Sequence, residues 1–129
     1  GKYRGGLGTR RVFEVVKGAE VTANALLDRT KKGFGAWGLE GGMKGGLAAI
    51  LIKRKGEENF QTFVEAYGTA SASKFTNISL FPGDQVVIES PGGGGYGNPL
   101  ERDSDLVQED IDQGFVSKEK ARKAYGWRG

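Results

Sequence analysis

Three glycine-rich stretches restrict how this chain can fold more than any other feature of its sequence. They are GKYRGGLG at residues 1–8, FGAWGLEGGMKGG at 34–46 and PGGGGYGNP at 91–99. Glycine weakens the interior of helices and strands, because it loses more conformational freedom on folding than any other residue. It is favoured where φ is positive or where another backbone approaches closely. We therefore expect these stretches to form loops with special backbone geometry.

The stretch at 91–99 is open to three interpretations: a phosphate-binding loop, a flexible linker or a rigid structural loop. A Walker-type phosphate loop needs Lys followed by Ser or Thr after its last glycine, but Asn98 and Pro99 follow here. A flexible linker would contain serine and would not place Tyr96 among the glycines. These arguments favour a rigid loop anchored by Tyr96. Its residues are Gly92, Gly93, Gly94, Gly95, Tyr96 and Gly97.

Most of the first 90 residues show the two-residue periodicity of β-strands. We predict strands at residues 7–16, 20–27, 47–53, 60–67, 75–80 and 85–89. Lys17 and Gly18 separate the first two, which are expected to form a hairpin, and a turn at Pro82, Gly83 and Asp84 should join the last two. The pattern indicates a mainly β, antiparallel domain of sandwich-like or barrel-like character.

After Pro99 the periodicity becomes helical. We predict a first helix at 104–113, capped by Asp103 and ended by Gly114, and a second helix after Ser117, ended by Gly126. The residues expected to face inward are Leu106, Val107, Ile111, Ala121, Ala124 and Tyr125. The fold prediction is therefore one domain over residues 1–129, with a β body at 1–90, a glycine-rich loop at 91–102 and a tail of two short helices at 103–129.

The composition excludes several kinds of chemistry. The chain has no cysteine and no histidine, which removes disulfides, thiolate metal sites and the commonest general base. No run of about 18 apolar residues is present, so we predict no membrane partner. The net charge of +3 is compatible with nucleic-acid binding, but the acidic stretch 101–112 and the basic stretch 118–128 are expected to neutralise each other. We therefore predict no nucleic-acid partner.

The ordered motifs of the chain resemble the C-terminal end of the hydantoinase B and 5-oxoprolinase family. They are KYRGGLG, DR, WGLEGG, LFPGDQVVIESPGGGGYGNPLERD, an acidic helix, GFVS and AYG. This family includes the B-type subunits of ATP-dependent N-methylhydantoinases and, more distantly, acetone and acetophenone carboxylases. Its glycine loop usually closes with Gly-Asp-Pro, and Asn98 here keeps the turn geometry but not the charge. Because B-type subunits are several times longer and the chain begins without Met, we expect it to be their last portion.

The resemblance implies an enzyme that couples ATP hydrolysis to the opening of a cyclic amide, such as a hydantoin or 5-oxoproline. It also implies three partners in the cytoplasm: the remainder of the B-type subunit, an A-type ATP-binding subunit or segment, and the cyclic-amide substrate. The divalent metal of the complete enzyme is expected upstream of Gly1, because this chain has no histidine. We expect the fragment to bind no cofactor and to be inactive alone. The alternatives are a non-catalytic assembly domain of a related carboxylase or hydrolase complex, and a stand-alone carbohydrate- or nucleic-acid-binding domain.

No residue is predicted to be catalytic or to bind a metal, but four are candidates for substrate binding. Arg4 is the first, because a guanidinium beside the backbone amides of Gly5 and Gly6 suits a carboxylate or a phosphorylated intermediate. A structural salt bridge is the alternative for Arg4. Trp37 is the fourth candidate; it either lines a substrate pocket or covers glycine backbone.

Other charged residues are expected to be structural. Arg29 and Arg102 stand close to acids in the sequence, so ordinary ion pairs are expected to explain both. Asp84 belongs to the predicted turn at residues 82–84. The acids of the first predicted helix are interpreted as a solvated face.

Overall fold

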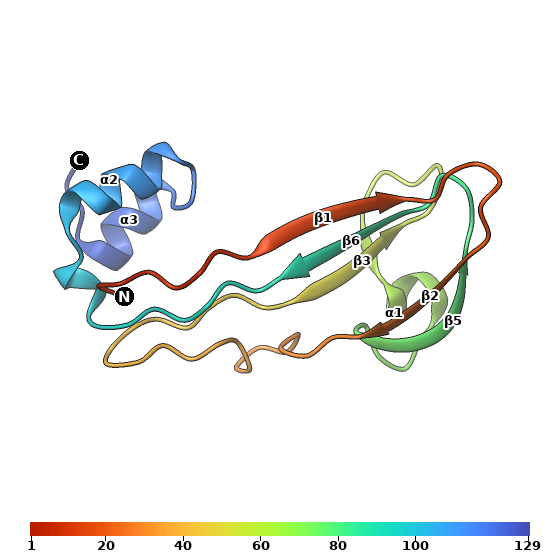
Figure 1. Cartoon of the computed structure of the whole chain (residues 1–129), viewed down its shortest axis with the longest axis horizontal. Coiled ribbons are helices and arrows are strands. Elements are labelled where there is room, and N and C mark those ends of the chain that lie inside the picture. The colour runs from red at the N-terminus through yellow and green to blue at the C-terminus, as the bar shows by residue number, and fades with distance from the viewer. The chain divides into compact units, whose positions relative to one another are not determined.

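The computed structural model describes all 129 residues and divides into two compact units (Figure 1). Unit 1 consists of residues 1–7, 36–46 and 92–129, and unit 2 consists of residues 8–35 and 47–91. Each unit combines segments that are far apart in the sequence. As a result the glycine-rich stretches gather mainly in unit 1, and the strands gather in unit 2. None of the helices has the length and apolar character needed to span a membrane.

Unit 2 contains six strands in two antiparallel sheets, which confirms the predicted mainly β class. The larger sheet has the order β1-β6-β3-β4, and the smaller sheet pairs β2 with β5, so neither sheet closes into a barrel. The sandwich-like form is therefore the better description. The strands are β1 (Thr9–Glu14), β2 (Val21–Leu26), β3 (Ala49–Lys53), β4 (Gln61–Thr62), β5 (Lys74–Leu80) and β6 (Gln85–Ser90).

The core of unit 2 joins the two sheets with a short helix, α1 (Phe63–Tyr67). Phe63 is fully buried, and its ring stacks on that of Phe75 with a centroid distance of 4.0 Å. Ile52 from the larger sheet is also fully buried in this cluster. Complete burial of one such side chain stabilises a fold by roughly 1.5–3 kcal/mol, so these residues hold the two sheets together.

The predicted hairpin of the first two strands is wrong. β1 pairs with β6, so that Val12 lies opposite Val87, and β2 pairs with β5. The chain leaves β1 at Val15, whose N–H donates to the carbonyl of Asp84 at 2.9 Å and whose carbonyl accepts from Gly83 at 2.8 Å. These bonds hold the connection against the 82–84 turn, so the chain passes from the larger sheet to the smaller one.

The predicted strand at 60–67 is wrong from residue 63 onward, because a capping box starts α1 there. The Thr62 hydroxyl accepts from the Glu65 N–H at 3.2 Å, and the Glu65 carboxylate accepts from the Thr62 N–H at 2.7 Å. The hydrogen bonds from Thr62 hold the pKa of Glu65 below its ordinary value. Gly68, at φ +67°, ends the helix. The T-x-x-E signal is present in the sequence, but alternating apolar residues around it favour a strand.

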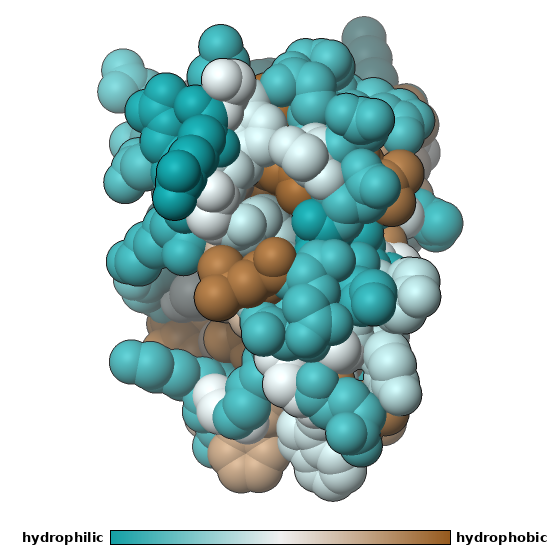
Figure 2. Space-filling model, turned by 90° about the vertical axis from the view of Figure 1, so that its left-hand side faces the viewer, coloured by the Kyte–Doolittle hydropathy of each residue, from teal (hydrophilic) through white to brown (hydrophobic).

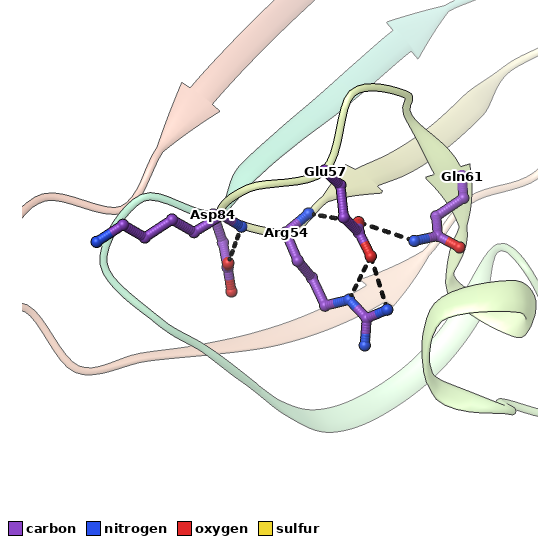
Figure 3. A network of polar contacts seen from close by, with 5 residues as sticks. Arg54, Glu57, Gln61 and Asp84 are labelled. Atoms are coloured by element: carbon purple, nitrogen blue, oxygen red, sulfur yellow. Dashed lines mark hydrogen bonds and ion pairs between the residues drawn. The ribbon is translucent and has the colours of Figure 1, made fainter.

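Asp84 is structural, as predicted. Its side chain is buried and accepts from the N–H groups of Lys55 at 2.9 Å and Phe81 at 2.8 Å (Figure 3). Gly83 has φ +95° at the third position of this turn, which is the geometry of a type II turn. The nearby Glu57 carboxylate accepts from the Arg54 guanidinium at 2.7 Å, which lowers the pKa of Glu57. These bonds fix the loops at one end of unit 2.

The helices of unit 1 follow the predicted caps. They are a 3-10 turn η1 (Pro99–Glu101) and two helices, α2 (Ser104–Asp112) and α3 (Lys118–Tyr125). Asp103 and Ser117 cap α2 and α3 through their side chains, and Gly126 ends α3 at φ +66°. Val107 is buried as predicted, whereas Leu106 is largely exposed. With α1, the chain has three α-helices where two were predicted.

Candidate functional site

Unit 1 is organised around three glycine-rich segments, residues 1–7, 36–46 and 92–97, which we call the glycine bundle. Segment 92–97 runs between the other two, as the side-by-side traces in Figure 1 show. Tyr3 and Tyr96 exchange two backbone hydrogen bonds of 2.9 and 3.0 Å. On the other side, the Leu39 N–H donates to the carbonyl of Gly95 at 3.0 Å, and the Gly97 N–H donates to the carbonyl of Leu39 at 2.9 Å. Tyr96 thus anchors the bundle through its backbone.

The segments of the bundle approach so closely that several positions have no room for a side chain. A Cβ at Gly94 would overlap the carbonyl of Trp37, and a Cβ at Gly42 would overlap the carbonyl of Gly95. Neighbouring backbone blocks a Cβ in the same way at Gly5, Gly38 and Gly45. Gly6, by contrast, has no atom within 4 Å of the Cβ position. Close backbone approach is therefore the main reason for glycine in this bundle.

The segment 36–46 reverses direction in a tight turn. Glu40 and Gly41 both have positive φ, at 48° and 85°, and the Gly42 N–H donates to the carbonyl of Leu39 at 2.8 Å. Two central residues with positive φ define a type I′ turn, which favours glycine. This turn brings both arms of the segment against residues 92–97.

A buried charge cluster fixes the first segment of the bundle to the helices. Arg102 Nη2 lies 2.9 Å from Asp110 Oδ2, and Arg4 Nε lies 3.1 Å from Asp110 Oδ1. Arg102 also donates from Nη1 to the carbonyl of Lys2 at 3.1 Å. The side chains of Arg102 and Asp110 are each only 6% exposed. A carboxylate at this depth needs such partners, because burial of an unpaired charge is very unfavourable.

The interpretation of the acidic helix as a solvated face is wrong at Asp110. Arg102 also pairs with Asp110 and not with its sequence neighbours. Asp110 follows the buried Val107 by three residues, which places it on the same side of α2, so helical periodicity was the available signal. The expected neutralisation of stretch 101–112 by stretch 118–128 is also wrong, because the ion pairs of the acidic stretch go to Lys2, Arg4 and Arg102.

The structure brings the four predicted substrate-binding residues together in unit 1. The guanidinium of Arg4 pairs with Asp110 and lies 5.1 Å from the ring centroid of Phe115. Gly5 packs against the backbone of residue 93, and the carbonyl of Gly6 accepts from the N–H of the same residue. The Trp37 side chain is 78% exposed and so does not cover the glycine backbone. Their role in substrate binding stays a prediction.

Large apolar side chains are exposed around the glycine bundle. They are Tyr3, Leu7, Trp37, Leu39, Met43 and Tyr96. Figure 2 faces the helical side of unit 1 and shows apolar residues, in brown, between polar ones, in teal. No three His, Cys, Asp or Glu side chains gather in a way that could hold a metal ion. The bundle therefore offers a rigid shape, exposed aromatic rings and one half-exposed guanidinium, and we derive no step through a metal in this chain.

The sequence model of the hydantoinase B/oxoprolinase family matches residues 1–99. The chain belongs to the hydantoinase B/oxoprolinase family. It is 34% identical over 126 residues to a putative D-/L-hydantoinase B-type subunit of Pseudomonas sp. strain NS671, covering 98% of this chain and 19% of that protein. It is 32% identical over 126 residues to the beta subunit of the caprolactamase of Pseudomonas jessenii, covering 98% of this chain and 20% of that protein. The chain thus spans about a fifth of the length of these relatives.

A solved structure agrees with this assignment to the hydantoinase B/oxoprolinase family. The crystal structure of the ATP-dependent caprolactamase from Pseudomonas jessenii superposes with a TM-score of 0.70 at 28% identity. The match covers 98% of this chain and 20% of the caprolactamase chain. The two units described above are therefore the fold of one part of a larger protein in that structure.

Proposed function

We propose that this chain is the C-terminal part of the B-type subunit of a cytoplasmic, ATP-dependent hydrolase that opens cyclic amides such as hydantoin or 5-oxoproline. The observation that carries the proposal is the glycine bundle, which unites the KYRGGLG, WGLEGG and PGGGGYG motifs in one unit. These are the motifs on which the resemblance to hydantoinase B rests. The relatives named as a hydantoinase subunit and a caprolactamase subunit support this class of reaction.

Within such an enzyme the chain supplies shape and positioning. It has no histidine or cysteine, and its buried acid, Asp110, is occupied by two arginines. An A-type subunit would hold ATP, and upstream residues of the B-type subunit would hold the divalent metal. The bundle contributes loops to the active site or to the interface between subunits. Arg4, whose side chain is 36% exposed, would orient an anionic substrate or intermediate, and the exposed Trp37 would contact the cyclic amide or the partner subunit.

The alternative is a non-catalytic assembly domain in a related carboxylase or hydrolase complex. The exposed apolar residues of the bundle favour a contact surface of some kind, which both functions require. What favours the hydrolase is that the candidate residues lie in one unit and not in scattered loops. The chemistry of the complete enzyme separates the two functions.

The test is to purify the complete B-type subunit that contains this sequence with its A-type partner and to assay hydantoin, 5-oxoproline and caprolactam. We expect ring opening that requires ATP and both subunits, with phosphate release that depends on the amide. A parallel assay supplies a ketone and bicarbonate in place of the amide. Carboxylation of the ketone with no ring opening of any amide would overturn the proposal.

A further inference from the structure

The strand β1 is an edge strand whose side chains are exposed along its whole length. It pairs only with β6 in the order β1-β6-β3-β4, and all six of its residues are exposed. Val12 and Phe13 are each 52% exposed. Since consecutive side chains point to opposite faces of a sheet, both faces are open over β1. The neighbouring strand differs, because Val86 and Val87 are both buried.

The polar side chains of β1 are already paired with β6. Arg10 Nε lies 3.0 Å from Glu89 Oε1, the hydroxyls of Thr9 and Ser90 are 2.9 Å apart, and the Glu14 carboxylate accepts from Gln85 at 2.8 Å. The central residues Arg11, Val12 and Phe13 have no such partner. What β1 leaves open is therefore mainly apolar.

The free edge of β1 has none of the devices that usually prevent pairing with another strand. Such devices are proline, β-bulges and inward-pointing charges. β1 contains no proline, and Thr9–Glu14 pairs with Gln85–Ser90 in an unbroken antiparallel register. A regular edge with exposed apolar side chains on both faces is suited to the addition of a further strand.

We propose that a β-strand from the remainder of the same B-type subunit pairs with the free edge of β1. This inference rests on the proposed function. The chain spans about a fifth of the length of its relatives, so most of such a subunit lies outside these residues and is available to supply the strand. The added strand would place apolar side chains beside Val12 and Phe13, and an acidic side chain near Arg11. This surface is distinct from the glycine bundle.

Hydrogen–deuterium exchange on the complete B-type subunit tests the added strand. A free edge leaves alternate amides of β1 open to solvent, whereas an added strand bonds them. We expect every amide of residues 10–14 to exchange at least about 100-fold more slowly than the amide of Gly18 in the exposed turn that follows. Alternate amides of β1 that exchange as fast as Gly18 would overturn the inference. Ring-opening activity in the same preparation reports on the proposed function separately.

Two matched variants of the complete subunit identify what covers β1. Val12→Lys should lower the melting temperature by about 4 °C or more and increase exchange at β1, because the introduced ammonium group would be forced beneath the added strand. Val64→Lys is the control, since Val64 is exposed on α1; it should leave both readings unchanged. Equal effects of the two variants would contradict the inference. A complete subunit that is dimeric and becomes monomeric with Val12→Lys would also overturn it, because a second copy would then be the occupant.

Discussion

Replacement of Gly94 with alanine should lower the free energy of unfolding of the B-type subunit. The expected loss is about 3 kcal/mol or more, measured as a shift in the urea unfolding transition that involves this chain. The added methyl group would overlap the carbonyl of Trp37, which belongs to a neighbouring backbone. A backbone carbonyl cannot rotate away as a flexible side chain can, so one of the segments must move, and the hydrogen bonds on both sides of segment 92–97 oppose that movement. Gly42→Ala should have a similar effect, because its methyl group would overlap the carbonyl of Gly95.

Gly6→Ala and Gly46→Ala are the matched controls within the same glycine bundle. Neither Cβ position has an atom within 4 Å, and neither residue has positive φ. Alanine at such a site reduces the conformational freedom of the unfolded chain, so we expect no loss and a gain of up to about 1 kcal/mol. If all four substitutions behave alike, the segments are not packed as described.

The second large effect is expected from Asp110→Ala. This substitution leaves the buried guanidinium of Arg102 without its carboxylate and removes the partner of Arg4 Nε. Removal of one member of a buried ion pair costs about 3–5 kcal/mol. The urea midpoint of the subunit should fall accordingly, and trypsin should cleave residues 1–7 more readily because they lose their attachment to α2.

Asp112→Ala provides the comparison on the same helix. Asp112 is exposed and accepts one hydrogen bond from Gln108, so its loss should cost about 0.5 kcal/mol or less. Asp110→Ala with the same small effect would show that the buried cluster does not hold the N-terminal segment in place.

Local signals in the sequence predicted the elements of this fold better than their partners. The strands, the caps at Asp103 and Ser117 and the type II turn at Gly83 depend on neighbouring residues, and each was predicted close to its position. The partner of β1 depends on a contact more than 70 residues away, with residues 85–90. A turn residue such as Gly18 favours a reversal of the chain but does not specify a hairpin, so the pairing was predicted wrongly.

The candidate site shows the same division. Clusters of glycine predicted close approach of backbones, but glycine has no side chain whose pattern could show which segments meet. The contacts of Gly42 and Gly94 with distant segments were therefore visible only in the structure. Asp110 was missed for a different reason. Its place on the buried side of α2 follows from helical spacing after Val107, but the surrounding acids suggested a solvated face.

Steady-state kinetics of Trp37→Ala in the complete enzyme test most directly whether the glycine bundle faces the active site or a subunit interface. The Trp37 side chain is 78% exposed within this chain, so its removal should not alter folding, and Leu26→Ala is a control of similar exposure in unit 2. We predict that Trp37→Ala lowers kcat/KM for ATP-dependent ring opening tenfold or more, about 1.4 kcal/mol, at an unchanged melting temperature. A kcat/KM within twofold of that of the Leu26→Ala enzyme would contradict this account.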